Sequence, residues 1–419
     1  MSFVNNLAEK IFNKKSLIEN YFEEAFKKNP PLLYNSIDIR HNSHKISAID
    51  SNCYPAGFNN LSDLAIIKGH QIFQNSQYQP TNSLNNIFII PENHSRNLKY
   101  FENLANLIQI LKNPYNQVFI ATYNPEITSI TEIITTNNNS IKLYPLHKIN
   151  KQLAIIDENK NTLFADLAVL NNDLTAGISE ILLDCQTPIH PSLKMGWYQR
   201  TKSQHFSFYQ NICAEIATIL NIDPWLISCI HAKCQDIDFK NNIGFECISH
   251  HVEEILNKIG EKYRQHQILS QPYCFVKADN GTYGMAVWAV KSPQDIIEIN
   301  KKERNKMNVI KGATPNHQVI IQEGIATSDS INDFPAEPMI YLINGQVVEN
   351  LYRCNQNRNN IESLNSAGAV FYNDQNLPTQ NNFNKNANNY SIVYELIGKI
   401  ASLACGLEEK TLPSTKLSK

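Results

Sequence analysis

Apolar and polar residues follow one another along the chain in blocks that predict helices and strands in turn. Residues 3–28 carry apolar side chains at helical spacing and end at the breaker Asn29-Pro30-Pro31. Residues 36–40 and 45–50 are then typical of two strands around the polar turn 41–44. This part of the chain therefore predicts a hairpin.

The next part of the chain predicts a parallel sheet. Short apolar segments at 87–90 and 118–121 have strand length, and helical patterns at 61–74 and 98–111 flank them. Such alternation is typical of a parallel sheet covered by helices. More strands are predicted at 141–146, 153–164 and 167–170. Residues 1–190 are expected to form an α/β domain.

Beyond residue 190 the pattern becomes helical and later returns to strands. Residues 191–271 are expected to form a helical linker or lid subdomain, with helices at 206–220, 224–230 and 246–263. Residues 272–419 are expected to form a nucleotide-binding region that closes with a helix at 391–407. Its strands are predicted at 273–278, 284–290, 318–323 and 338–343.

Composition narrows the class of protein. The 419 residues include 37 Lys and Arg against 39 Asp and Glu, so no basic surface suggests nucleic acid or an anionic membrane as a partner. The N-terminus lacks a signal-peptide pattern, and no uninterrupted apolar run approaches the ~18–20 residues that span a bilayer. Nine scattered cysteines without a CxxC pair predict reduced thiols. We expect a cytoplasmic protein that acts on small molecules, and its oligomeric state is left open.

A candidate phosphate site lies between residues 273 and 290. An apolar strand carries Lys277, and the turn that follows contains Gly281, Thr282 and Gly284. Backbone N–H groups approach an anion closely where no Cβ obstructs, and a lysine supplies a point charge for a phosphoryl group. The segment lacks the GK[ST] ending of a Walker A loop, and a strand rather than a helix follows it. A plain hairpin whose glycines only form a turn remains the alternative.

The strands that follow favour a nucleotide site. The strand at 318–323 ends in Gln322 and Glu323, as expected of a hinge that contacts adenine and ribose. A later strand ends at Arg353, and Asn365 lies in the next turn. Lysine strand, glycine loop, hinge strand, arginine strand and asparagine turn occur in the order of the ATP-grasp fold, which this region resembles.

Several segments together resemble a known family, the proteobacterial type of glutamate-cysteine ligase. They lie at 50–60, 91–97, 171–177, 196–206, 273–290 and 364–368. The resemblance extends over nearly the whole chain and implies an ATP- and Mg²⁺-dependent enzyme. Its implied reaction joins L-glutamate to L-cysteine, the first step of glutathione biosynthesis.

The expected metal-binding hairpin of an ATP-grasp enzyme is missing after Asn365, and the N-terminal hairpin has the required form. Asp50 and Asn52 are alternate residues of one strand and point the same way, so they can share magnesium ions; Asp38 is a further candidate carboxylate. We infer a circularly permuted, ATP-grasp-like α/β fold whose metal hairpin, within 36–60, comes from the start of the chain. The alternative is that these residues only cap turns.

The same reasoning assigns the remaining groups. Lys277 and Arg353 are expected to hold phosphates, and Arg40 or Arg96 a substrate carboxylate, because a guanidinium pairs with it bidentately. A surface ion pair is the alternative for either arginine. Glu92 and His94 follow a strand end, where α/β enzymes place substrate groups. The basic run at 200–205 predicts either a lid over phosphates or a solvated helix start.

Three other functions stay open at this point. Another ATP-grasp ligase with a different amine acceptor would carry the same phosphate and metal groups, because pocket shape decides the acceptor. A kinase is disfavoured because neither an HRD-type loop nor a DFG motif is present. A nucleotide-binding regulator without catalysis is disfavoured, because candidate ligands for both the phosphates and the metal are present.

Overall fold

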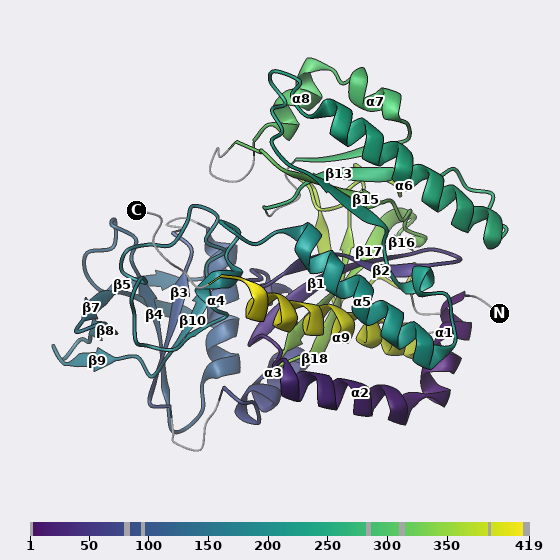
Figure 1. The fold of residues 1–419 in the computed structure, drawn as a ribbon. Helices are drawn as coiled ribbons and strands as arrows, with labels where there is room; N and C mark the ends of the chain where they lie inside the picture. The colour runs from purple at the N-terminus through teal and green to yellow at the C-terminus, as the bar shows by residue number, and fades with distance from the viewer. Residues whose placement is uncertain are drawn as a thin grey trace.

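The computed structural model describes residues 3–78, 84–93, 97–281, 286–309, 315–383 and 387–413. These residues form a mixed α/β structure built around several sheets, with helices packed on them (Figure 1). The sequence predicted a mixed α/β fold, and this is confirmed.

A mostly antiparallel sheet lies at the centre of the molecule and joins the two ends of the chain. Its order is β19-β18-β17-β1-β2, and β16 pairs with β17. The hairpin β1–β2, purple in Figure 1, lies against strands that follow it by about 300 residues. The strands are β1 (Tyr34–His41), β2 (Ile46–Asn52), β16 (Asp329–Ile331), β17 (Phe334–Ile343), β18 (Gln346–Cys354) and β19 (Val370–Tyr372).

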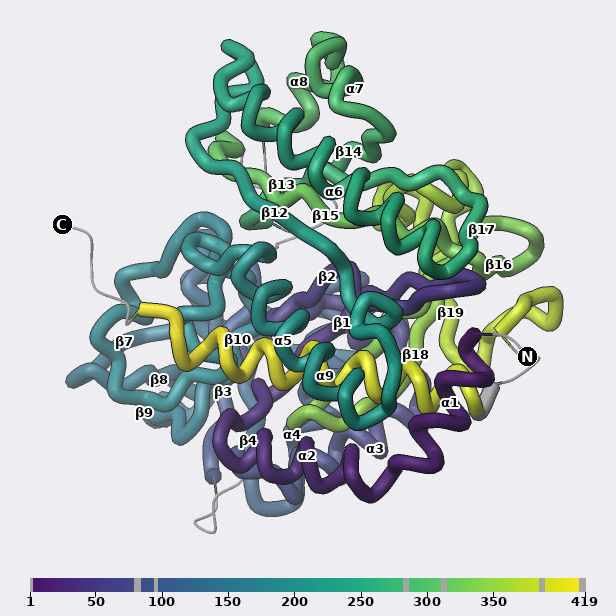
Figure 2. Tube along the Cα trace, turned by 45° about the vertical axis from the view of Figure 1, so that its right-hand side comes forward, coloured from purple at the N-terminus to yellow at the C-terminus, as the bar shows by residue number. Residues whose placement is uncertain are grey.

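Apolar side chains project from both faces of this sheet, and helices therefore cover both faces. On β17, Ile340 and Leu342 pack on one side, whereas Met339, Tyr341 and Ile343 pack on the other, as the period of two in a strand requires. Figure 2 shows the yellow helix α9 running alongside α5, with α1 and α2 nearby. The helices of this face are α1 (Phe3–Asn13), α2 (Lys15–Lys28), α5 (Lys202–Leu220) and α9 (Ala387–Thr411).

Helix α9 is a core helix. Its segment Asn389–Thr411 is long and apolar enough to cross a membrane. The sequence did not predict this, because charged residues such as Glu395 and Lys399 interrupt the apolar run. However, 67% of its most apolar window is buried inside the protein, against the central sheet and α5. Its apolar character is thus explained by the core that it fills.

The second sheet forms the α/β part of the chain predicted from the alternating pattern. Its order is β11-β10-β3-β4-β6-β5, and all neighbours except β5 and β6 are parallel. Its elements are β3 (Asn86–Pro91), β4 (Gln117–Thr122), β5 (Thr131–Ile134), β6 (Ser140–Pro145), β10 (Leu167–Asn171) and β11 (Ile189–His190), with helices α3 (Asp63–Gln74) and α4 (Leu98–Leu111). A small separate sheet contains β7 (His147–Ile149), β8 (Gln152–Ile156) and β9 (Thr162–Phe164).

The third sheet, with order β12-β15-β13-β14, carries the predicted phosphate strand (green, top of Figure 1). Its strands are β12 (His231–Cys234), β13 (Cys274–Ala278), β14 (Val287–Val290) and β15 (Val319–Glu323). Its helices are α6 (Phe245–Gln265), α7 (Pro293–Ile297) and α8 (Lys301–Met307). The predicted helices of 191–271 divide between two cores, because α5 packs with α9 and α6 packs on this third sheet. The domain boundaries stay a prediction.

Four details differ from the sequence predictions. The helix predicted at 224–230 is only a short 3-10 helix at Pro224–Ile227, and the strand predicted at 153–164 divides into β8 and β9. The helical region 3–28 is two helices, because the chain bends at Lys14 between α1 and α2. Cys234 and Cys247 form a disulfide, so the prediction that all nine cysteines are reduced thiols is wrong for this pair. Thirteen positions without a recognised motif separate the two thiols, and only the packing of α6 on β12 brings them together.

Candidate active site

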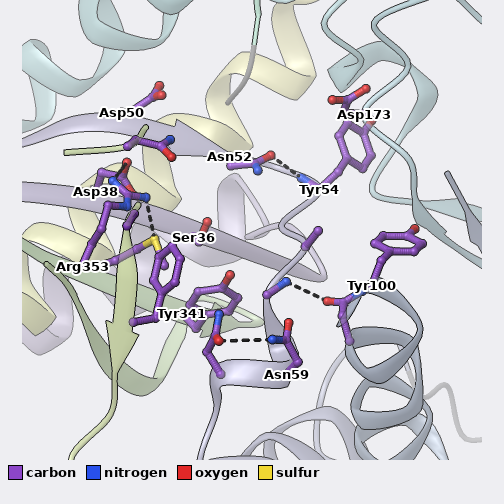
Figure 3. A pocket seen from close by; sticks show the side chains of 18 of the residues that line it. Ser36, Asp38, Asp50, Asn52, Tyr54, Asn59, Tyr100, Asp173, Tyr341 and Arg353 are labelled. Carbon is purple, nitrogen blue, oxygen red and sulfur yellow. Dashed lines mark hydrogen bonds and ion pairs between the residues drawn. The ribbon is translucent and has the colours of Figure 1, made fainter. Parts of the chain in front are cut away.

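A cavity of about 450 Å³ opens between the N-terminal hairpin, the parallel sheet and β17–β18. Figure 3 shows Asp38, Asp50 and Arg353 on one side of it, and Tyr54, Tyr100 and Asp173 on the other. A smaller cavity continues from the hairpin toward Lys277 on β13. Segments from the beginning, middle and end of the chain therefore meet at one place.

The hairpin presents a row of oxygen atoms to the large cavity. Asp38 is paired in register with Asp50, and Ser36 with Asn52, so all four side chains lie on one face of the two strands. All four line the cavity. The Asn52 carboxamide oxygen also accepts a hydrogen bond from the Tyr54 N–H at 3.0 Å, which fixes its orientation. Carboxylate, amide and hydroxyl oxygens are the ligands that Mg²⁺ prefers.

Cations surround these carboxylates. Lys202 donates to Asp50 at 2.5 Å. Arg353 donates to both oxygens of Asp38, at 2.9 and 3.2 Å, and to Glu337 at 2.7 Å. Lys277 donates to the Gln322 carboxamide oxygen at 2.7 Å and to a backbone carbonyl of β2 at 3.2 Å. Lys202, Lys277 and Arg353 are buried, whereas the Asp38 side chain is 13% exposed and the Asp50 side chain 35% exposed.

Burial and neighbouring charges shift the pKa of these groups in different directions. Burial, together with the nearby Lys202 and Arg40, lowers the pKa of Lys277 to about 8, although Asp50 opposes this. Burial acts to raise the pKa of Asp50, but the two lysines outweigh it and the pKa is lowered. Burial dominates at Asp38, whose pKa is raised despite Arg353. Nearby charges thus affect the protonation of Lys277 and Asp38, so a charged ligand bound beside them would change it as well.

Gly281 and Asn365 line both cavities, next to Lys277 and Arg353. Thr282, Gly284, His94 and Arg96 lie outside the described residues. Glu92 lines the large cavity.

Arg40 lines the smaller cavity but is engaged by the protein. Its guanidinium donates to Glu337 at 2.6 Å and to the backbone carbonyls of Ile325 and Glu362, at 3.3 and 2.5 Å. Glu337 thus joins Arg40 to Arg353. In this arrangement Arg40 stabilises the strands behind the cavity.

The two hinge residues of β15 have different surroundings. Gln322 supports Lys277, as described above. The Glu323 carboxylate accepts from Trp225 Nε1 at 2.9 Å and from the Ile230 N–H at 3.0 Å, and it pairs with Lys45 at 2.7 Å. These contacts hold β15 against the central sheet. The carboxylate does not line either cavity.

A buried charge network behind the hairpin was missed from sequence. Arg200 donates to the backbone and side-chain oxygens of Ser51, both at 2.7 Å, and to Glu408 of α9 at 2.8 and 3.1 Å. His205 contacts Glu408 at 3.2 Å. Arg200 and His205 are 1% exposed, so neither a lid nor a solvated helix start describes them. Because Ser51 lies between Asp50 and Asn52, Arg200 holds the strand of these candidate metal ligands in place.

Lys202 and Glu337 were also not singled out, and the signals for them were weak. Lys202 was part of the basic run at 200–205, and Glu337 only opened a predicted strand. Residue spacing alone does not indicate that Lys202 contacts Asp50 or that Glu337 contacts Arg40, because these partners lie about 150 and 300 positions away.

The loop after the hairpin, which lines the large cavity with Ala56 and Gly57, is held by α4 and β17. Asn103 of α4 accepts from the N–H groups of Gly57 and Phe58, at 2.8 and 3.0 Å, and so fixes the loop after the hairpin. Gly57 has φ of +148°, and an added Cβ would lie 2.4 Å from the Tyr341 hydroxyl. Only glycine allows this close approach of loop and ring.

A mixed α/β fold with carboxylates, amides and cations gathered around two cavities is typical of an enzyme that acts on small polar molecules. The sequence profile of the glutamate-cysteine ligase family matches residues 8–409, so the chain belongs to this family. Its activity is accordingly that of a glutamate-cysteine ligase.

A solved structure agrees with this assignment. A crystal structure from Methylobacillus flagellatus KT, assigned as a gamma-glutamylcysteine synthetase, is 31% identical, with a TM-score of 0.87, and covers 97% of this chain and 96% of that one. D-alanyl-alanine synthetase A from Vibrio cholerae is 11% identical over 75% of this chain and 80% of that one, and its TM-score of 0.33 is too low to indicate a shared fold. No curated protein matches the chain.

Proposed function

We propose that this ligase uses ATP and Mg²⁺ to activate the γ-carboxylate of L-glutamate as an acyl phosphate, which the amine of L-cysteine then attacks. This reaction is the first step of glutathione biosynthesis, and we place it in the cytoplasm. One observation carries the proposal: Asp38, Asp50 and Arg353 line both cavities, the larger of which also contains Asn52 and the smaller Lys277. Oxygen ligands next to strand-borne cations are what a metal–polyphosphate substrate requires.

The hairpin residues fit a magnesium ion. Asp50, Asn52 and Asp38 would hold it, since their oxygens share one face and line the cavity. Magnesium supplies neutralisation of phosphate charge when it is bound. Asp50 pairs with Lys202 and Asp38 with Arg353, so a bound ion would share both carboxylates with these cations.

The protein's own residues position and neutralise the reactants. Lys277 and Arg353 would contact phosphate oxygens, with backbone N–H groups near Gly281 and the amide of Asn365 beside them. The phosphoryl group passes from ATP to the glutamate carboxylate and leaves ADP. The cysteine nitrogen then bonds to the activated carbon and phosphate departs. Most of the rate enhancement comes from holding these groups in line.

We also propose that the nucleotide-binding region is an ATP-grasp arrangement in which the metal hairpin is supplied by the start of the chain. The pairing of β1 with β17 supports this idea, because it places Asp38 beside Arg353 although 315 positions separate them. An uninterrupted ATP-grasp chain would deliver the same hairpin after Asn365.

ADP release tests the proposal. We expect ADP to form with ATP, Mg²⁺, glutamate and cysteine together, and not without glutamate. If glycine or alanine clearly replaces cysteine as acceptor, the ligase mechanism holds and the acceptor assignment fails. If no ADP forms with any amino acid, the nucleotide site is wrong. Lys277→Met should abolish ADP release while circular dichroism shows a folded protein.

A further inference from the structure

A second candidate site lies in the lobe that carries Lys277, and its residues are not among those that line the two cavities. Cys234 is the last residue of β12, and Cys247 and His251 lie on α6. Because the latter two are four positions apart on a helix, both face β12. One ligand atom from each of the three residues lies within 4.8 Å of the other two. Cys234 is buried, whereas Cys247 and His251 are half-buried, so the group is accessible from solvent.

We propose that this group is a redox-controlled zinc site. Two thiolates and an imidazole are a ligand set that selects Zn²⁺ over Mg²⁺, which prefers oxygen. Ligand atoms around one zinc ion lie about 3.3 to 3.8 Å apart, given bond lengths of about 2.0 to 2.3 Å, and the observed spread allows this after small side-chain rotations. Water completes the fourth position, since the described residues contribute three ligands.

The histidine has the support that metal-bound imidazoles usually have. Glu254, one turn further along α6, contacts His251 Nδ1 at 3.0 Å. The carboxylate keeps the proton on Nδ1 and leaves the lone pair on Nε2 for a cation. A carboxylate behind a ligating histidine orients the ring and raises its basicity.

The disulfide and the zinc site are alternative states of the same two sulfur atoms. In the disulfide, both sulfurs are bonded to each other and offer no thiolate. A dithiol reductant converts the disulfide to two thiols and is itself oxidised to a disulfide. Zinc then replaces the two thiol protons, which are released to solvent.

Either state ties α6 to the sheet of the phosphate strand. Cys234 pairs in register with Val319 of β15, and β15 pairs with β13, which carries Lys277. Zinc therefore stabilises the lobe when the disulfide is absent, and the enzyme keeps its phosphate strand in place in a reducing environment.

The test uses the full-length protein, reduced with a phosphine. The reduced protein is titrated first with Co²⁺, a spectroscopically visible substitute for Zn²⁺, and then with Zn²⁺ itself. We expect one equivalent of Co²⁺ with a thiolate-to-cobalt absorption band that Zn²⁺ removes, and no band in the oxidised protein. Cys234→Ser and Cys247→Ser should weaken binding at least about 100-fold, and Glu254→Gln by about tenfold. Cys185→Ser, which changes a half-buried free thiol in another part of the chain, is the matched control and should bind as the wild type.

A second measurement needs no variant. In the reduced wild type, Zn²⁺ should protect Cys234 and Cys247 from alkylation, as read by mass spectrometry, and leave Cys185 reactive. Absence of the absorption band in the reduced wild type, its survival in Cys234→Ser, or alkylation of both cysteines in the presence of Zn²⁺ would each overturn the zinc site. Because none of these readouts involves ATP, they are independent of the ligase mechanism.

Discussion

Raising the pH should switch off the use of ATP by removing the charge of Lys277. Burial lowers the pKa of this lysine from its ordinary value of 10.5 to about 8. A change of this size corresponds to about 3 kcal/mol of destabilisation of the charged form. A neutral amine no longer attracts phosphate, so kcat/KM for ATP should fall about tenfold per pH unit above pH 8.

The same shift has the opposite effect on folding stability. The unfolded chain holds the Lys277 proton up to about pH 10.5, whereas the folded protein releases it near pH 8. Between these values the unfolded state binds more protons, so the free energy of unfolding contributed by Lys277 rises with pH, by at most about 3 kcal/mol. Activity and this part of the stability should therefore change in opposite directions.

The assay compares the wild type with Lys277→Arg between pH 7 and 10. Arginine stays charged throughout this range, and both proteins share the titrations of cysteine and glutamate. The ratio of the wild-type kcat/KM for ATP to that of Lys277→Arg reports the titration of Lys277 alone. This ratio should fall above pH 8. Urea unfolding of the wild type and Lys277→Met measures the stability difference. A ratio that stays constant from pH 7 to 10 would refute the reasoning, as would a stability difference that does not change with pH.

Two further substitutions test the metal hairpin and its support. Asp50→Asn should raise the Mg²⁺ concentration needed for half-maximal ADP formation by about tenfold or more, because a charged ligand is lost, whereas the exposed Asp184→Asn should leave it unchanged. Glu408→Gln leaves Arg200 buried without its full counter-charge, so it should cost about 3–5 kcal/mol of unfolding free energy in urea. A cost below about 1 kcal/mol would show that Ser51 and water suffice for Arg200.

The sequence predicted the local elements well where breakers and periodicity coincide. The hairpin of residues 36–50 was confirmed because the polar turn at 41–44 separates two strands with buried apolar residues. The strands at 87–90 and 118–121 were confirmed as parallel neighbours, because the helix predicted between them, α4, returns the chain to the same end of the sheet. Lys277 of β13 and the hairpin carboxylates Asp38 and Asp50 line the same smaller cavity, while their roles in binding stay a prediction.

Contacts between distant segments were not predictable from one sequence. Glu323 ends a strand in a hinge-like pattern, yet Trp225 and Lys45 occupy its carboxylate. Arg200 appears in a basic run, yet it is buried against a glutamate 208 positions later. Periodicity reports which side chains are buried, but the partner of a buried charge depends on how helices and sheets pack.

The position of β1 between β2 and β17 has a consequence for the biosynthesis of the protein. The ribosome completes β1 (Tyr34–His41) long before its partner β17 exists, since Phe334–Ile343 lies about 300 residues later. At about 5–20 residues per second, β1 waits roughly 15 to 60 seconds with one edge unpaired. An exposed strand edge pairs readily with other chains. Nascent chains that stall before residue 343 should therefore depend on chaperones, and fragments that lack β17 should aggregate through the hairpin that carries the candidate metal ligands.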